Sequence, residues 1–106
     1  MSTAREFFES TLPAKLTPDL AAAIGAHFQF NIDGAGGGSW TVDLTQADNW
    51  IQEGVSEAAD CTIAMKEQDF LGVVAGTTNP QMAFMLGKIK VTGNLALSLK
   101  LPKILG

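Results

Sequence analysis

The chain has 106 residues, of which 46% are hydrophobic and 17% charged, and its formal net charge is −4. This size and composition predict one domain, residues 1–106, with a single core, and they exclude an intrinsically disordered chain. The acidic balance, without a stripe of alternating arginine and aromatic residues, argues against nucleic acid as a partner.

The first 25 residues predict two short helices. Thr3–Glu6 fits a capping box and begins a helix that we expect to stop at Pro13. Thr17 and Pro18 are a typical cap and first helical residue, and Gly25 is a typical helix exit.

Three short strands are expected next. Apolar and polar residues alternate in His27–Ile32 and again in Trp40–Leu44, and a glycine-rich run at 34–38 separates the two segments. Such alternation around a turn predicts a β-hairpin. Trp50–Gln52 is a candidate for a further short strand.

The pattern then changes between strand and helix several times. Cys61–Met65 alternates as a strand with Cys61 and Met65 inward, and a helix with an acidic first turn begins at Glu67 and closes at Gly76. Asn79 and Pro80 begin another helix. Lys88–Thr92 predicts a strand whose lysines lie on its wet face.

The closing segment, Leu95–Leu101, fits two structures. Its leucines recur every second residue, as in a strand, but they also form pairs four residues apart, as in a helix. Leu, Ala and Lys favour helix, so we prefer a helix with Pro102 near its end. Helices, strands and helices in this order predict an α+β domain with helices gathered on one face of the sheet.

Groups that could perform catalysis are few. His27 is the only histidine and sits on the polar face of a strand, Cys61 alternates inward like a small core residue, and the glycine run leads into a strand. A phosphate-binding loop would instead lead into a helix. We therefore expect no catalytic residue, no metal site and no cofactor.

Apolar residues dominate the last third of the chain. Ordinary core packing is one explanation. The alternative is a wall around an apolar ligand, because the closing segment is more apolar than one docked face requires and methionines suit an adaptable surface. The residues concerned are Phe70, Val74, Met82, Phe84, Met85, Leu95, Leu97, Leu99, Leu101 and Ile104.

Charge is distributed unevenly. Residues 1–69 hold eleven acids and three bases, a charge of −8, whereas residues 70–106 hold no acid and four lysines, a charge of +4. The lysines are Lys88, Lys90, Lys100 and Lys103, and they predict either a solvated face or a transient contact with an anionic membrane.

The segment "ADCTIAMKEQDFLGVVAGTTNPQMAFMLGKIKVTGNLALSLKL", Ala59–Leu101, resembles the sterol carrier protein 2 family. The family's sequence elements are matched by Ala59-Asp60 with Thr62-Ile63, by Asp69-Phe70-Leu71, by Asn79-Pro80-Gln81 with Ala83-Phe84, and by Gly87 through Asn94. The N-terminal half is similar more loosely, through the hairpin segment Phe28–Leu44.

The resemblance implies a five-stranded, mainly antiparallel sheet with helices on one face that enclose a hydrophobic tunnel. It also implies non-catalytic binding or transfer of a lipid, such as a fatty acid, a fatty acyl-CoA or a sterol-like molecule. By position, the tunnel walls would be Trp40, Trp50, Phe70, Val74, Phe84, Met85, Leu95, Leu97, Leu99 and Leu101, with Gln81 near the mouth.

Two further expectations concern context. Eukaryotic members of the family typically end in a peroxisomal tripeptide, whereas this sequence ends Ile104-Leu105-Gly106, so we expect a stand-alone, bacterial-type member or a domain cut from a larger protein. A single cysteine excludes an internal disulfide, and a cytoplasmic location is the default. An accessory module that docks on a lipid- or quinone-metabolising enzyme is the alternative function.

Overall fold

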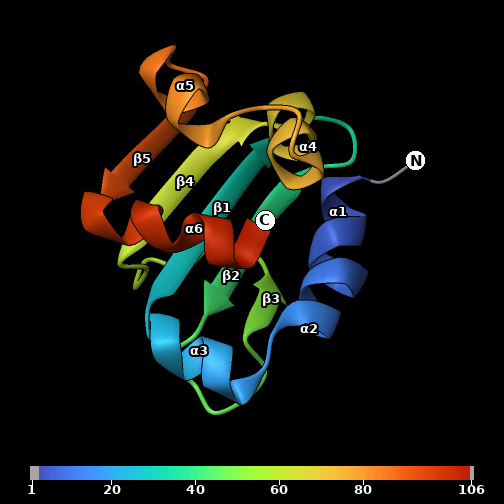
Figure 1. Cartoon of the computed structure of the whole chain (residues 1–106). Helices are drawn as coiled ribbons and strands as arrows, with labels where there is room; N and C mark the ends of the chain where they lie inside the picture. Colours follow the sequence, from blue (N-terminus) through green and yellow to red (C-terminus); the bar gives the residue numbers. More distant parts are fainter. Residues whose placement is uncertain (1–2, 106) are drawn as a thin grey trace.

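The computed structural model describes residues 3–105, with only the backbone of Ser98, Leu101 and Pro102 (Figure 1). Its elements are α1 (Ala4–Glu6), η1 (Phe7–Thr11), α2 (Leu12–Lys15), α3 (Pro18–Ile24), β1 (His27–Asp33), β2 (Gly38–Asp43), β3 (Ile51–Glu53), β4 (Cys61–Lys66), α4 (Glu67–Ala75), α5 (Pro80–Met85), β5 (Ile89–Gly93), η2 (Leu95–Lys100) and α6 (Leu101–Leu105).

The N-terminal helix continues beyond Pro13, so the expectation that it stops there is wrong. Thr3 caps it as expected, since its Oγ1 accepts the Glu6 N–H at 3.1 Å. The wider π-helical turn of η1 ends where Leu12 N–H donates to the Phe7 carbonyl, and Pro13 then falls in the first turn of α2. Proline lacks an N–H and is tolerated there, so the wider turn lets the helix pass it.

The second helix and the hairpin agree with the sequence. Thr17 Oγ1 accepts the Leu20 N–H, and α3 ends at Gly25 in the left-handed region, with φ +58°. β1 and β2 pair antiparallel, with Phe30 opposite Trp40.

The sheet has the strand order β3-β2-β1-β4-β5. Its outer and hairpin pairs are antiparallel, but β1 and β4 run parallel, with Phe30 beside Ile63. The fold class is therefore confirmed as α+β with a mixed, mainly antiparallel five-stranded sheet. A parallel pair needs a long crossover, and the chain makes it by laying β3 on the far edge before returning.

The closing segment is helical, but its boundary differs from expectation. η2 is a 3-10 helix, and α6 begins at Leu101, so Pro102 lies at the start of the last helix and not near the end of one. Proline fits the first turn of a helix because the N–H that it lacks has no helical acceptor there.

One face of the sheet forms the core. Phe28, Phe30 and Ile63 point to this face and are fully buried, and α1–α4 and α6 lie over it, with α5 beyond the edge formed by β5 (Figure 1). The opposite face is partly covered by the chain after β3. Gln29 is buried there, because its Oε1 accepts the Ser56 N–H at 2.7 Å and its Nε2 donates to the Gly54 carbonyl.

Candidate functional site

Two of the expected wall residues belong to an aromatic cluster in the core. The ring of Phe8 stacks on Trp40, with centroids 5.2 Å apart, and on Phe70, at 5.4 Å. Phe30 completes the cluster at 5.3 Å from Phe8. All four side chains are buried. The N-terminal helix therefore fills the space over β1 and β2, and Trp40 and Phe70 help to hold that helix on the sheet.

Trp50 lies at the opposite edge of the sheet from β5. It precedes β3, is partly buried against the core, and donates from Nε1 to the Gln46 carbonyl at 3.0 Å. Trp50 is therefore separated from the α5 region by the width of the sheet.

Most of the remaining expected wall residues lie on two elements next to β5. Both α5 and η2 contact this edge strand. Phe84, Leu95 and Leu99 are 49%, 55% and 75% exposed. Val74 and Leu97 are half-buried against the core. Gln81 and Met85 are exposed on α5, and the side chain of Leu101 lies outside the described residues.

Burial decreases toward this edge of the sheet. The inward residues of β1 and β4 are buried, as is Ile89 at the start of β5, whereas Val91 of the same strand is only half-buried, although it faces the core opposite Ile63. We call the side chains of Phe84, Val91, Leu95, Leu97 and Leu99 the β5 apolar edge. Val91 was not anticipated, since sequence alone does not reveal which strand ends at an uncovered margin.

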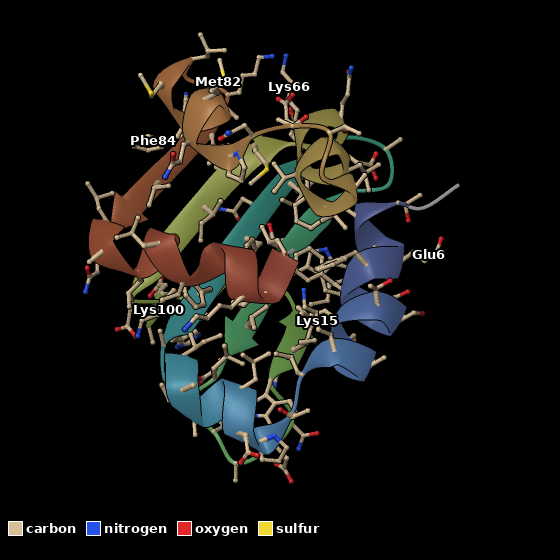
Figure 2. All side chains as sticks on the ribbon, in the orientation of Figure 1. Glu6, Lys15, Lys66, Met82, Phe84 and Lys100 are labelled. Atoms are coloured by element: carbon tan, nitrogen blue, oxygen red, sulfur yellow. The ribbon has the colours of Figure 1, made fainter. Side chains whose placement is uncertain are left out.

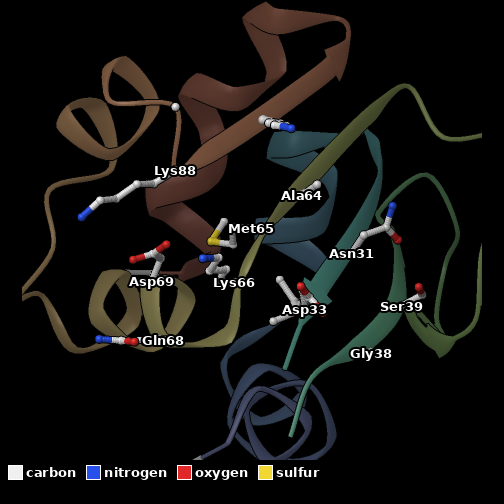
Figure 3. A pocket seen from close by; sticks show the side chains of 13 residues that line it. Asn31, Asp33, Gly38, Ser39, Ala64, Met65, Lys66, Gln68, Asp69 and Lys88 are labelled. Atoms are coloured by element: carbon white, nitrogen blue, oxygen red, sulfur yellow. The ribbon is translucent and has the colours of Figure 1, made fainter. Parts of the chain in front are cut away.

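Two surface depressions lie elsewhere. A groove of about 790 Å³ runs over the outward residues Asn31, Ser39 and Ala64 to the first turn of α4 (Figure 3). Another of about 550 Å³ lies around His27, Trp50 and the 54–58 segment. Neither lies between the sheet and the helices, where the aromatic cluster is packed, so the enclosed tunnel stays a prediction.

The acid–base groups form no reaction centre among the described residues. His27 Nδ1 lies 3.8 Å from Asp43 Oδ2, and its Nε2 is buried without a hydrogen-bond partner in the described chain. Burial works to raise the pKa of Asp43, but hydrogen bonds from the side chain and backbone of Thr45 outweigh it, and the pKa is lowered. Within residues 3–105, no three His, Cys, Asp or Glu side chains come close enough to hold a metal ion.

Cys61 is a core residue. It is fully buried, and burial, with a smaller contribution from Asp60, raises the pKa of its thiol. A raised pKa disfavours the nucleophilic thiolate, so the position gives no sign of covalent chemistry.

The glycine-rich turn is tied to the rest of the molecule. Glu67 Oε1 accepts the Gly36 N–H at 3.1 Å, and its Oε2 accepts the Ala4 N–H at 3.0 Å. The carboxylate therefore joins the turn, the start of α1 and the start of α4. The expectation that this turn binds no phosphate agrees with its place next to a carboxylate.

Fold and site together define a small α+β domain with an uncovered apolar edge on its sheet. Residues 6–106 match the model of the SCP-2 sterol transfer family, and the chain belongs to that family. It is 42% identical over 84 residues to human sterol carrier protein 2, which covers 76% of this chain and 15% of the human protein.

Solved structures agree with this family membership. Sterol carrier protein 2 from Yarrowia lipolytica, in its apo form, superposes with a TM-score of 0.73 at 28% identity, covering 96% of this chain and 83% of that one. The palmitated SCP2L2 from Aedes aegypti has a TM-score of 0.70 at 27% identity, covering 94% and 92%. The chain spans less than a sixth of the human relative, and none of the helices among residues 3–105 is long and apolar enough to cross a bilayer.

Proposed function

We propose that this chain is a non-catalytic lipid carrier that holds an acyl chain against the β5 apolar edge. The observation that carries the proposal is the contrast in burial across one sheet face: the inward residues of β1 and β4 are buried, whereas Val91 of β5 is only half-buried, beyond the buried Ile89, and α5 and η2 add exposed apolar side chains next to it. The palmitated state of the similar mosquito protein supports a fatty acid as the first ligand to test.

The energetics suit a carrier that must release its cargo. Burial of a 16-carbon chain at about 0.8 kcal/mol per methylene gives about 12 kcal/mol gross. Association and ordering cost about 4–15 kcal/mol, which leaves weak to moderate affinity. Because no hydrogen-bonding pattern is required, fatty acids, fatty acyl-CoAs and sterol-like molecules all remain candidate ligands.

Titration with palmitate tests the proposal. Delipidated protein is expected to bind palmitate, and Phe84→Gln with Leu95→Gln is expected to weaken binding about tenfold, because the polar amides replace apolar contacts. Val55→Gln is the matched control, since Val55 is also strongly exposed but precedes β4 on another part of the surface. Absence of binding, or an equal loss in the control, would contradict the proposal.

The same titration separates the carrier from an accessory module. A module that only docks on an enzyme would show no saturable palmitate binding, with its apolar edge covered by the partner protein. The cytoplasmic location and the stand-alone, bacterial-type status stay predictions.

A further inference from the structure

Helix α5 turns its apolar face away from the protein. Met82 and Met85 are three residues apart and therefore share one side of the helix, and Leu86 follows directly as its C-cap. They are 60%, 82% and 67% exposed, whereas Ala83, on another side, is buried. A surface helix normally turns such a stripe toward the core. We call Met82, Met85 and Leu86 the α5 outer face.

This orientation is fixed by hydrogen bonds at both ends of the helix. Asn79 Oδ1 accepts the N–H groups of Gln81 and Met82, at 2.9 and 3.3 Å. At the other end Lys88 N–H donates to the Ala83 carbonyl at 2.8 Å, through a turn in which Gly87 has φ +77°. The short helix is therefore a built projection at the end of β5 (Figure 1).

The side chains of α5 point in two directions. Phe84 lies toward β5, whereas Met82 lies on the upper side of the helix, away from the sheet (Figure 2). Phe84 belongs to the β5 apolar edge, where the lipid is proposed to lie. The α5 outer face points outward and contributes nothing to that edge.

Positive charge accompanies the outer face. Lys88 follows it directly and Lys90 comes two residues later, both exposed. No acidic residue occurs in 70–106. The nearest acid along the chain is Asp69, which lines the groove beside Lys66, Lys88 and Lys90 (Figure 3). Exposed apolar side chains next to lysines are the composition that favours an anionic bilayer surface.

The other predicted lysine contacts are placed differently. Lys100 is half-buried and donates from Nζ to the Ile24 carbonyl at the end of α3, 3.2 Å away. Lysine near the last carbonyls of a helix stabilises that helix end. Lys100 is therefore occupied within the protein and Lys103 is exposed on α6, whereas Lys88 and Lys90 follow the α5 outer face within four residues of the chain.

We propose that α5 is the membrane-docking element: Met82, Met85 and Leu86 enter the headgroup boundary of an anionic bilayer while Lys88 and Lys90 contact lipid phosphates. The inference rests on the proposed carrier function, because a carrier has to meet the membrane to exchange cargo. A second copy of the chain fits less well, since it would bring its own Lys88 and Lys90 against the same lysines.

Vesicle flotation tests the docking surface. The wild type is expected to bind vesicles of phosphatidylcholine with phosphatidylserine more tightly than pure phosphatidylcholine, and to lose this preference at high salt. Met82→Gln with Leu86→Gln is expected to reduce binding about tenfold or more. Lys88→Ala with Lys90→Ala is expected to reduce it on the order of 25-fold, at about fivefold per lysine.

Matched controls separate the surface from general effects. Val55→Gln removes an equally exposed apolar side chain, and Lys15→Ala removes a lysine on α2, so both are expected to bind like the wild type. Equal losses in these controls, or no loss in the α5 variants, would overturn the proposal. Concentration-dependent self-association that the α5 variants abolish would also overturn it, in favour of a second copy.

Palmitate binding without vesicles distinguishes the two proposals. The variant Met82→Gln with Leu86→Gln is expected to bind palmitate within about twofold of the wild type, because Met82 and Leu86 lie outside the β5 apolar edge. Vesicle docking without palmitate binding would refute the carrier function alone. If the α5 variants bind both palmitate and vesicles like the wild type, the docking surface alone is refuted and the carrier function stands.

Discussion

Substitution of Phe8 by alanine tests whether the aromatic cluster is core or ligand wall. Phe8 is fully buried, and its ring lies within 5.4 Å of the rings of Trp40, Phe30 and Phe70. Removal of a buried phenylalanine typically costs about 3–5 kcal/mol, a range that includes the loss of its ring contacts. We expect a loss of about 4 kcal/mol in the free energy of unfolding.

Urea unfolding followed by tryptophan fluorescence measures this loss, and thermal unfolding should show a fall in Tm of about 15 °C. Phe84→Ala is the matched comparison. Its side chain is half exposed, so we expect a cost below about 1 kcal/mol. The two variants should rank the other way round in palmitate affinity. Phe84→Ala should weaken palmitate binding, whereas the folded fraction of Phe8→Ala should bind palmitate like the wild type.

A loss below about 1 kcal/mol for Phe8→Ala would refute the assignment of this cluster to the core. A large loss of palmitate affinity in that variant would also refute it, because Phe8 would then be lining the ligand site and not supporting the helix.

Three further predictions concern buried and tied groups. Glu67→Ala should lower the free energy of unfolding by about 2–4 kcal/mol in urea titrations, because the N–H groups of Ala4 and Gly36 lose a charged acceptor. The exposed Glu57→Ala should leave the free energy of unfolding unchanged, and equal effects of the two substitutions would refute the role of Glu67. Cys61 should react with a thiol reagent at pH 8 only after unfolding, since burial raises its pKa; fast labelling of the native protein would contradict this. The pKa of Asp43 is lowered in the folded protein, so the stability that Asp43 contributes is full above its unfolded pKa, near 4, and is lost as the pH falls through the folded pKa. Asp43→Asn should therefore flatten the pH dependence of the free energy of unfolding in that range, and an unchanged slope would contradict this.

Local signals in the sequence predicted most of the elements. The caps at Thr17 and Asn79, the glycine exit at Gly25 and the period-two segments each depend on a few neighbouring residues, and the structure confirms them. Pro13 was misjudged because the π-helical turn that accommodates it has no recognised sequence signature.

The site was less predictable because it depends on tertiary cover. Trp40 and Phe84 are both aromatic, yet one stacks in the core and the other lies half exposed at the β5 edge. The spacing of Met82, Met85 and Leu86 predicts an apolar helix face, but the direction in which that face points follows from the position of α5 beyond the sheet. Glu67 was recognised as a helix start, whereas its bonds to Ala4 and Gly36 join segments more than thirty residues apart.

The most direct test of lipid binding at the β5 apolar edge is a palmitate titration followed by backbone NMR. The account predicts saturable shifts confined to α5, β5 and η2, with the residues of the aromatic cluster and the β1 and β2 residues of the outward groove, Asn31 and Ser39, unchanged. Saturable shifts centred on Phe8, Trp40 and Phe70, or an absence of shifts at saturating palmitate, would contradict it.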